Sequence, residues 1–356
     1  MSENAEKPRI LIVRRDNIGD LICTLPLISA IRQLNPAARI DILVNSYCAP
    51  VMLGNPDMDH VYIYTKAKHK ESGESALGVY WRRLLLTLKL RFAKYDWLVL
   101  ANVSCQPRPL RWAKQVGARR IVGFTEAGCK GAEIISDPIP LVRGQGKHEV
   151  EYLMALLQPF GQVAEVRAAR IAADTALLQR AEAKLTFARQ TGKPLVGINL
   201  SARLPSQQWP AEKFVELINL LKPCYHSVLF WAPGSASNAG HPGDDEKAAL
   251  VAAAFGKDDV TCMPTQQLGE LIAGIACVDL LVTADGGALH IGAACGKPEV
   301  VMFGDSDSTQ WYPWRVPYKL LHPASRDVRS IEAADIAAAV DQLVQQTNRR
   351  DRSNDA

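Results

Sequence analysis

Short apolar runs alternate with longer amphipathic segments along most of the chain. Most of the runs are apolar throughout, which is typical of parallel strands that are covered on both faces. They predict strands at 9–14, 39–44, 60–64, 96–101, 120–124, 194–200, 227–232, 278–283 and 299–303. The segments between them predict helices at 18–34, 77–93, 148–158, 176–190, 211–222, 245–255, 267–275, 287–295 and 331–346. This alternation predicts an α/β fold.

The predicted strands form two series, and a charged helical segment at 165–190 separates them. A chain of 356 residues is long enough for two domains. We predict an N-terminal domain over 1–172, a C-terminal domain over 173–330, a C-terminal helix over 331–348 and a disordered tail over 349–356. Each domain is expected to be a doubly wound, Rossmann-like sheet. A cleft between two such domains is the default ligand site.

The charge of the chain is uneven. Residues 1–170 hold 24 Lys and Arg against 16 Asp and Glu, a net charge of +8, whereas the remainder holds 17 against 21, a net charge of −4. A basic half suits a phosphorylated substrate or an anionic membrane surface, and a merely solvated surface is the alternative. Because aromatic residues do not interleave with the basic ones, no nucleic-acid partner is expected.

The remaining bulk features concern compartment and metals. No run of about 18 apolar residues occurs, so no membrane-spanning helix is predicted, and the polar start MSENAEKPR is unlike a signal peptide. The eight cysteines form no CxxC pair, which argues against a zinc site. We therefore expect free thiols in a reduced cytosol.

The first informative motif is ILIVRRDNIGDLICTLPLISAIR, residues 10–32. A predicted strand ends at Arg14 and Arg15, and the following turn carries Asp16 and Asp20. In open α/β sheets ligands bind beyond the carboxyl ends of the strands, so this turn is a candidate site. The alternative for Asp20 is a carboxylate that stabilises a helix N-terminus by roughly 0.3–1 kcal/mol.

Two local expectations concern helices. Pro26 lies inside the first apolar helical pattern, where an interior proline costs about 3 kcal/mol, so we expect a kink or a delayed helix start. Asp244 precedes another helical pattern and is expected to be its N-cap.

A second motif, LVTADGGALHIGAACGKPEVVMFGDSD, covers residues 281–307. A predicted strand ends before Asp285, and Gly286 and Gly287 lead into a helix that carries His290. Adjacent glycines allow close approach of a ligand, and a helix N-terminus suits a diphosphate. The alternative is a tight turn that Asp285 caps.

A third stretch, INLSARLPSQQWPAEKFVELINLL, covers residues 198–221. Its loop offers Ser201, Ser206 and Gln207 as hydrogen-bonding groups for a diphosphate, before proline begins a helix. Taken alone, this signal is weak, because ordinary loops have the same composition.

Taken together and in this order, the three motifs resemble those of the ADP-heptose lipopolysaccharide heptosyltransferases, glycosyltransferase family 9. The resemblance spans about residues 9–320. It implies the GT-B fold, with the sugar acceptor on the first domain and the nucleotide-sugar on the second. It also implies an inverting reaction that needs no metal and no cofactor.

The resemblance assigns roles to the first motif. Asp20 matches the catalytic carboxylate of the family, which removes a proton from the acceptor hydroxyl, and Asp16 is the rival base. Arg14 and Arg15 are then expected to hold anionic groups of the acceptor.

The resemblance also assigns the donor site, with two departures from the family pattern. Gly286 stands where the family has Thr or Ser, and Gln207 stands where it commonly has Lys, so Arg203 is a candidate for the missing charge. Asp305 and Asp307 are the only local carboxylates that could resemble a metal-binding pair. The expected donor-binding residues are Ser201, Gln207, Asp285, Gly286, Gly287 and His290.

The predicted function is transfer of a heptose from ADP-heptose to a lipopolysaccharide core acceptor. The expected partners are this nucleotide-sugar and an anionic, lipid-linked saccharide. The expected location is the cytoplasm, with peripheral contact at the inner membrane. A GT-B enzyme with another nucleotide-sugar or glycan acceptor is one alternative, and a catalytically degenerate binding protein is another.

Overall fold

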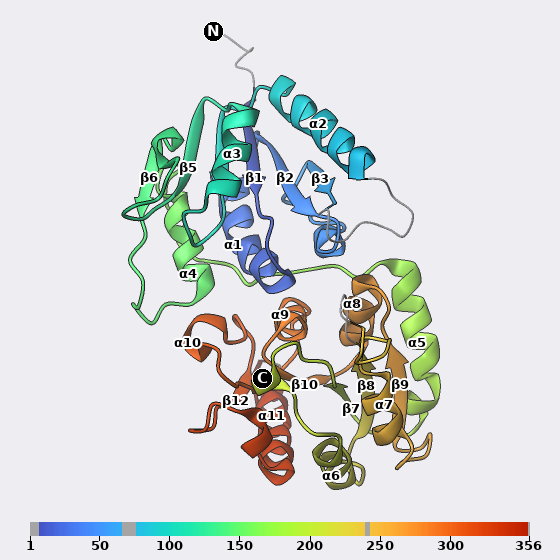
Figure 1. Ribbon diagram of the computed structural model, residues 1–356. Helices are drawn as coiled ribbons and strands as arrows, with labels where there is room; N and C mark the ends of the chain where they lie inside the picture. The colour runs from blue at the N-terminus through green and yellow to red at the C-terminus, as the bar shows by residue number, and fades with distance from the viewer. Residues whose placement is uncertain (1–6, 66–75, 239–242, 355–356) are drawn as a thin grey trace. The chain divides into compact units, whose positions relative to one another are not determined.

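The computed structural model describes residues 7–65, 76–238 and 243–354 and divides the chain into two compact units. The N-terminal unit is Met1–Ala169 and the C-terminal unit is Arg170–Ala356. Each unit contains one parallel sheet with helices on both faces (Figure 1). Among the described residues, no helix is both long enough and apolar enough to span a membrane.

The N-terminal sheet has six strands in the order β3-β2-β1-β4-β5-β6, and all of their pairings are parallel. Its central strand β1 has four buried aliphatic residues, since side chains on both of its faces are covered by helices. The strands are β1 (Arg9–Val13), β2 (Arg39–Asn45), β3 (His60–Tyr64), β4 (Trp97–Leu100), β5 (Arg120–Thr125) and β6 (Asp137–Pro140).

Helices α2 (Ala76–Phe92) and α3 (Pro107–Val116) lie side by side on one face of this sheet (Figure 1). They contribute Leu90 and Trp112 to a core with Leu11 and Leu43 of the strands. Helices α1 (Ile18–Leu34) and α4 (Glu149–Met154) pack together on the other face. Short 3₁₀ helices are η1 (Ala49–Met52), η3 (Ala132–Ile134) and η4 (Ala155–Leu157).

The C-terminal sheet repeats this plan in the order β12-β11-β10-β7-β8-β9, again with parallel pairings. One face packs on helices α6, α7 and α11, and helices α5, α8 and α9 pack in succession on one another. The strands are β7 (Leu195–Asn199), β8 (His226–Trp231), β9 (Val260–Pro264), β10 (Leu280–Ala284), β11 (Glu299–Met302) and β12 (Tyr318–Leu321). The helices are α5 (Thr175–Gln190), α6 (Ala211–Leu221), α7 (Asp245–Ala252), α8 (Leu268–Cys277), α9 (Gly287–Ala294), α10 (Ser308–Trp311) and α11 (Ala333–Asn354).

The predicted α/β class and the two doubly wound sheets are confirmed, and each predicted strand or helix has a counterpart. Of the two outcomes expected at Pro26, the delayed helix start is wrong, because helix α1 begins at Ile18 and continues through Pro26 to Leu34; the buried apolar side chains along it offset the lost hydrogen bond. Helix α11 extends to Asn354, so it enters the tail that was expected to be disordered over 349–356, whose last two residues lie outside the described residues.

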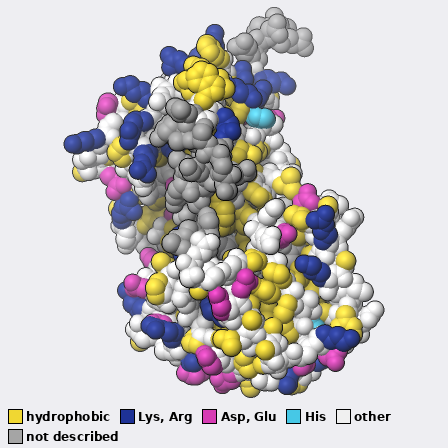
Figure 2. Space-filling model, turned by 45° about the vertical axis from the view of Figure 1, so that its right-hand side comes forward, with side chains coloured by type: hydrophobic (Ala, Val, Ile, Leu, Met, Phe, Trp, Pro, Cys, Tyr) yellow, Lys and Arg dark blue, Asp and Glu magenta, His cyan; other side chains and the backbone are white. Residues whose placement is uncertain are grey.

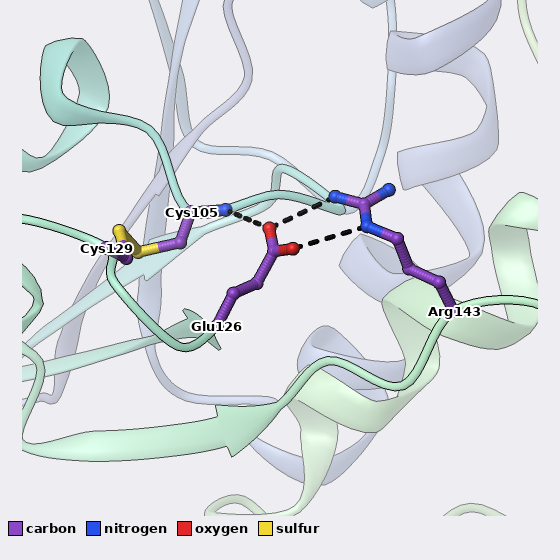
Figure 3. The surroundings of a disulfide bond; sticks show 4 residues. All are labelled: Cys105, Glu126, Cys129 and Arg143. Carbon is purple, nitrogen blue, oxygen red and sulfur yellow. Dashed lines mark hydrogen bonds and ion pairs between the residues drawn. A yellow bond between two sulfur atoms is a disulfide. The ribbon is translucent and has the colours of Figure 1, made fainter.

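A disulfide joins Cys105 to Cys129, so these two cysteines are not the free thiols that we expected of a reduced cytosol. Cys105 follows β4 and Cys129 follows β5, and these neighbouring strands bring the two Cα atoms within 5.9 Å. Glu126 supports the same loops, since it accepts hydrogen bonds from the backbone N–H of Cys105 at 3.1 Å and from Arg143 at 3.0 Å (Figure 3). The ion pair with Arg143 and the Cys105 N–H lower the pKa of Glu126.

Reduction of this disulfide is expected to lower the free energy of unfolding by about 3 kcal/mol, because it frees a loop in the unfolded chain. The two cysteines lie 24 residues apart. Chemical denaturation of oxidised and reduced protein would measure the difference. A Cys105→Ser, Cys129→Ser double variant should have the same free energy of unfolding under oxidising and reducing conditions. Thiol titration of the denatured, unreduced protein should find the six free cysteines; a count of eight would contradict the disulfide.

Glu299, the first residue of β11, is fully buried, and neither of its carboxyl oxygens has a hydrogen-bond partner among the described residues. Gly292 of α9 leaves the space for it, since a Cβ there would lie 2.6 Å from Glu299 Oε1. Burial raises the pKa of Glu299 well above its ordinary range. The folded state therefore binds this proton more tightly than the unfolded chain does.

Replacement of Glu299 with glutamine is expected to stabilise the protein increasingly as pH rises. A carboxyl with a raised folded-state pKa contributes its full stability below its ordinary pKa of about 4.3 and loses it as pH rises through the folded-state pKa. Glutamine carries no charge, so it removes that loss. Free energies of unfolding at several pH values between 4.5 and 8 would measure the effect. Glu216→Gln, at an exposed position of α6, is the control, and equal pH slopes in both variants would contradict the prediction.

Candidate active site

Both sheets have a topological switch point, which is where ligands bind in open α/β sheets. In the N-terminal unit the chain runs from β1 outward to β3 and then returns to β4 on the other side of β1. In the C-terminal unit it runs from β7 outward to β9 and returns to β10. The three sequence motifs follow β1, β7 and β10, so they lie at these switch points.

Arg14, at the end of β1, is the centre of a buried ionic cluster. Its Nη2 donates to Asp20 Oδ1 at 2.6 Å and to Glu149 Oε1 at 3.1 Å, and its Nε lies 3.5 Å from Asp16 Oδ2. Its Nη1 donates to the carbonyl of Ala101. Burial opposes the charged guanidinium, but attraction by the carboxylates of Asp20, Asp16 and Glu149 leaves the pKa of Arg14 raised.

The expectation that Arg14 holds the acceptor stays a prediction, and this geometry gives Arg14 protein partners instead. Its side chain is almost wholly buried, and its donors point at protein oxygens. A guanidinium with five N–H donors suits several acceptors at once. The structure therefore favours Arg14 as a positioning residue that holds Asp16 and Asp20 at the switch point.

Asp20 lies in the first turn of α1, where both of its carboxyl oxygens are engaged. Oδ1 accepts from Arg14, and Oδ2 accepts from the backbone N–H of Asn17 at 3.0 Å. The side chain of Asp20 is 18% exposed, against 37% for Asp16. Asp20 thus makes a capping contact at the N-terminus of α1, as expected if it only stabilises the helix. Its side chain nevertheless keeps access to solvent. The rival, Asp16, accepts a hydrogen bond from Asn102 Nδ2.

Arg15 differs from Arg14 because its guanidinium remains partly exposed. Its Nε donates to the hydroxyl of Tyr64 at 3.0 Å, and its charge lies 4.8 Å from the centre of the Tyr64 ring. It also lies 5.7 Å from the ring of Trp112. These contacts leave Arg15, and not Arg14, as the arginine of the motif that is available to an anionic ligand.

Sequence reasoning missed three residues of this site, namely Asn45, Asn102 and Glu149. Asn45 ends β2 and donates to the carbonyl of Asp16 at 2.8 Å, and Asn102 follows β4. Their position directly after predicted strands was a usable signal. Glu149 gave none, since it lies 135 residues from Arg14 in the chain.

In the C-terminal unit, Asp285 follows β10, and its backbone N–H donates to Met302 of β11 at 2.9 Å. Gly286 and Gly287 lead directly into α9, so the N-terminus of this eight-residue helix opens at the switch point. Burial raises the pKa of Asp285, although hydrogen bonds from Ser306, Gln207 and the N–H of Gly286 oppose the rise.

Gln207 does not face outward toward a diphosphate as expected. It is buried in the 3₁₀ helix η5 (Pro205–Gln207), where its Nε2 donates to Asp285 Oδ2 at 2.9 Å and to Ser306 Oγ at 3.3 Å. Gly304 permits this close packing of loops, because a Cβ there would lie 2.2 Å from the carbonyl of Ser206. Gln207 therefore orients Asp285, and sequence reasoning missed Ser306 as the third member.

Ser201 and Asp244 form a second link between loops. Ser201 Oγ donates to Asp244 Oδ2 at 2.6 Å and accepts from the backbone N–H of Ala232 at 2.9 Å. Asp244 occupies the N-cap position of α7 as expected, but its side chain makes no capping bond and pairs with Lys247 at 3.0 Å. The Ser201 hydroxyl is thus already committed to Asp244.

His290 and Arg203 complete the predicted donor residues. His290 is buried on α9, and its ring packs edge-on against Trp311 of α10 at 5.8 Å between centres. Arg203 is exposed on the loop after β7. The structure thus brings together Gln207, Asp285, Gly286 and Gly287 around one switch point, with His290 on the helix behind them.

Comparisons with known proteins agree with this arrangement. A model of glycosyltransferase family 9 (heptosyltransferase) matches residues 86–332. Lipopolysaccharide heptosyltransferase 3 of Escherichia coli is 27% identical over 345 residues, which cover 92% of this chain and 96% of that protein.

Solved structures share the fold. The glycosyl transferase family 9 protein from Veillonella parvula DSM 2008 superposes with a TM-score of 0.81 at 19% identity, covering 97% of this chain and 100% of that one. E. coli heptosyltransferase WaaC, solved with ADP-2-deoxy-2-fluoro heptose, superposes with a TM-score of 0.72 at 19% identity, covering 95% and 99%.

Two Rossmann-like units with a polar switch point in each match the GT-B class of fold. The chain belongs to glycosyltransferase family 9, the heptosyltransferases, which confirms the resemblance seen in its motifs. The matched range contains Gln207 and Asp285 but begins after Asp20, so the catalytic role of Asp20 stays a prediction.

Proposed function

We propose that this enzyme transfers a heptose from ADP-heptose to the lipopolysaccharide core with inversion at the anomeric carbon. The observation that carries the proposal is a partly exposed carboxylate at one switch point and an open helix N-terminus at the other, in a chain of this family. The printed names of its relatives support the donor and the acceptor: one acts on lipopolysaccharide, and one was solved with an ADP-heptose analogue.

In the proposed mechanism, Asp20 removes the proton from the acceptor hydroxyl as that oxygen attacks the anomeric carbon. The bond between this carbon and the diphosphate breaks, and ADP leaves with the bonding electrons. Asp20 holds the proton at the end of the step. A single attack inverts the configuration, so no covalent sugar-enzyme is required. Arg15 is proposed to bind an anionic group of the acceptor, and the N–H groups that begin α9 to bind the diphosphate.

The direct test is an incubation with ADP-heptose and a heptose-deficient core saccharide. Mass spectrometry should show addition of one heptose, and nuclear magnetic resonance should show the opposite anomeric configuration to that of the donor. Retained configuration would reject the single-attack mechanism. Absence of any transfer with binding-competent protein would reject the proposed function.

A second candidate is the same chemistry with another nucleotide-sugar or glycan acceptor. Gly286 supplies no hydroxyl, and Gln207 is turned toward Asp285, so the donor site lacks two contacts of the family pattern. A panel of ADP-, UDP- and GDP-sugars would separate the two candidates by rates of nucleotide release. Binding of a nucleotide-sugar with neither transfer nor hydrolysis would instead indicate a degenerate binding protein.

Transfer is expected to survive a chelator such as EDTA, because we propose that no metal and no cofactor take part. The two carboxylates that could resemble a metal pair have protein partners: Asp305 Oδ1 lies 2.9 Å from Arg326 Nε, and Asp307 Oδ1 accepts from the N–H of Thr309 at 2.9 Å. Product should be measured directly, since coupling enzymes often need Mg²⁺. Loss of activity that Mg²⁺ or Mn²⁺ restores would contradict this expectation.

We also propose a cytoplasmic location with peripheral contact at the inner membrane, where a lipid-linked acceptor would be available. The basic balance of residues 1–170 supports contact with an anionic surface. Fractionation of cells into soluble and membrane parts, with and without a high-salt wash, would test this location.

A further inference from the structure

Helix α2 is apolar on two opposite faces. On the inner face Leu90 is buried and Leu86 packs on the same core. Positions separated by four, seven and eleven residues share one face of a helix, and this face lies opposite Leu86 and Leu90. We call these outward residues the α2 stripe: Trp81, Leu85, Leu88 and Phe92.

The α2 stripe is exposed although it is made only of large hydrophobic side chains. The exposed fractions run from 40% for Leu88 to 76% for Phe92, and Leu84 beside the stripe is also exposed. At 1.5 Å of rise per residue the stripe is about 16 Å long. A contiguous apolar surface of this kind marks an interaction site more often than scattered single residues do.

The charged residues within helices α2 and α3 are all of one sign. Helices α2 and α3 contain no Asp or Glu, and they pack against each other. Figure 2 shows exposed hydrophobic side chains among dark blue Lys and Arg side chains in the upper part of the view. The basic residues of the two helices are Arg82, Arg83, Lys89, Arg91, Arg108, Arg111 and Lys114.

We propose that the α2 stripe docks on the surface of a bilayer that contains anionic lipids. A helix with Trp, Phe and Leu on one face and basic residues beside it lies in the headgroup region with its apolar face inserted. The basic side chains of α2 and α3 are attracted to anionic headgroups at the same time. The biological role of this docking rests on the proposed function, because a lipid-linked acceptor would lie in the same bilayer. The surface itself is inferred from the residues of α2 and α3 alone.

A second copy of the chain is a poorer occupant of this surface. A twofold interface brings the same patch of both subunits together, so the basic residues of α2 and α3 would meet those of the second copy, and neither helix carries an acidic residue to pair with them. Like charges across an interface oppose association. The charge pattern therefore favours an anionic partner, and a bilayer offers an apolar layer directly beneath its charge.

The test is co-sedimentation of the full-length protein with phosphatidylcholine vesicles with and without about a third phosphatidylglycerol. We expect binding to the anionic vesicles that weakens as salt rises. An Arg82→Gln, Lys89→Gln variant should bind roughly 25-fold more weakly, at about fivefold for each charge. A Trp81→Gln, Phe92→Gln variant should lose at least as much affinity for the anionic vesicles. The matched control is Leu250→Gln on α7, a leucine that is 64% exposed compared with 62% for Trp81.

Thermal melting establishes that each variant is folded, and transfer to a deacylated, soluble acceptor is measured without vesicles. Unchanged transfer together with lost vesicle binding supports the inference. Vesicle binding equal to that of the unmodified protein in the Trp81→Gln, Phe92→Gln variant overturns it, as does equal binding to neutral and anionic vesicles. A concentration-dependent dimer that these substitutions abolish would overturn it in favour of a second copy. Absence of transfer in the unmodified protein would reject the proposed function but leave the vesicle result standing.

Discussion

Substitution of Asp20 by asparagine is expected to reduce the rate of transfer by roughly 10²–10⁴-fold, the usual contribution of a positioned general base. The amide keeps the shape of the side chain but cannot take up a proton. One hydrogen bond to Arg14 or to the N–H of Asn17 is lost, so the free energy of unfolding should fall by only about 1 kcal/mol. ADP affinity should be unchanged, since we propose that ADP binds residues of the C-terminal unit.

Asp16→Asn is the matched control for this substitution, because Asp16 lies in the same turn and also contacts Arg14. Initial rates of transfer at saturating donor would rank the two variants, and calorimetry would measure their ADP affinities. Asp16→Asn should be the milder change. If it is the more damaging one, the base is Asp16, whose side chain is the more exposed of the two. A large fall in ADP affinity in Asp20→Asn would remove Asp20 from the role of base.

Most of the strands that could be predicted from the sequence are those whose composition reflects burial on both faces; the edge strand β3 is the exception. Strands β1, β4, β7 and β10 are central in their sheets, and each appears as an apolar run. The three strands that were missed, β6, β9 and β12, all lie at sheet edges. An edge strand has a single neighbour and more contact with solvent, so its sequence, such as DPIP in β6, lacks the apolar run.

Helix α3 was missed for a related reason. Its sequence PRPLRWAKQV has two prolines and three basic residues. This composition indicates a loop if the places of the prolines within the segment are ignored. Pro107 lies at the first helical position, where a proline costs little because its missing N–H would have no helical partner. The buried residues Leu110, Trp112 and Ala113 then attach the helix to the sheet.

The location of the candidate site could be predicted from the sequence, but the hydrogen-bond partners of its side chains could not. The motifs identified polar residues after β1, β7 and β10, and parallel topology brings such positions to the same edge of a sheet. The partner of each side chain depends on distant segments. Gln207 contacts Asp285, which is 78 residues away, and Arg14 contacts Glu149 from α4. Three side chains that were assigned to ligands, those of Arg14, Ser201 and Gln207, are for this reason hydrogen-bonded to other protein groups.

Replacement of Arg14 by methionine is expected to lower the free energy of unfolding at pH 7 by roughly 3–5 kcal/mol, the typical loss when one partner of a buried ion pair is removed. Methionine preserves much of the packing volume but leaves Asp16, Asp20 and Glu149 without their shared cation. Glu149 is buried, so its charge loses the neighbouring guanidinium that stabilises it. This loss should also displace Asp20 and reduce transfer.

The pH dependence of this loss identifies its electrostatic origin. Without Arg14, burial and neighbouring carboxylates favour the protonated form of Glu149, so the variant binds this proton more tightly when folded. The variant then keeps its stability near the ordinary pKa of a glutamate, about 4.3, and loses stability as pH rises. The difference in free energy of unfolding between Arg14→Met and the unmodified protein should therefore be smaller at pH 5 than at pH 7. Urea denaturation at the two pH values would measure it. Arg111→Met, at an exposed arginine of α3, should change stability by less than about 0.5 kcal/mol.

A double variant, Arg14→Met with Glu149→Gln, separates charge from packing. Removal of the stranded negative charge should recover part of the stability that Arg14→Met alone loses, and the remainder measures lost hydrogen bonds and packing. If the double variant is no more stable than Arg14→Met, or if the deficit is the same at pH 5 and pH 7, Arg14 contributes through packing alone. The buried cluster would then not be the electrostatic support that holds Asp20 at the switch point.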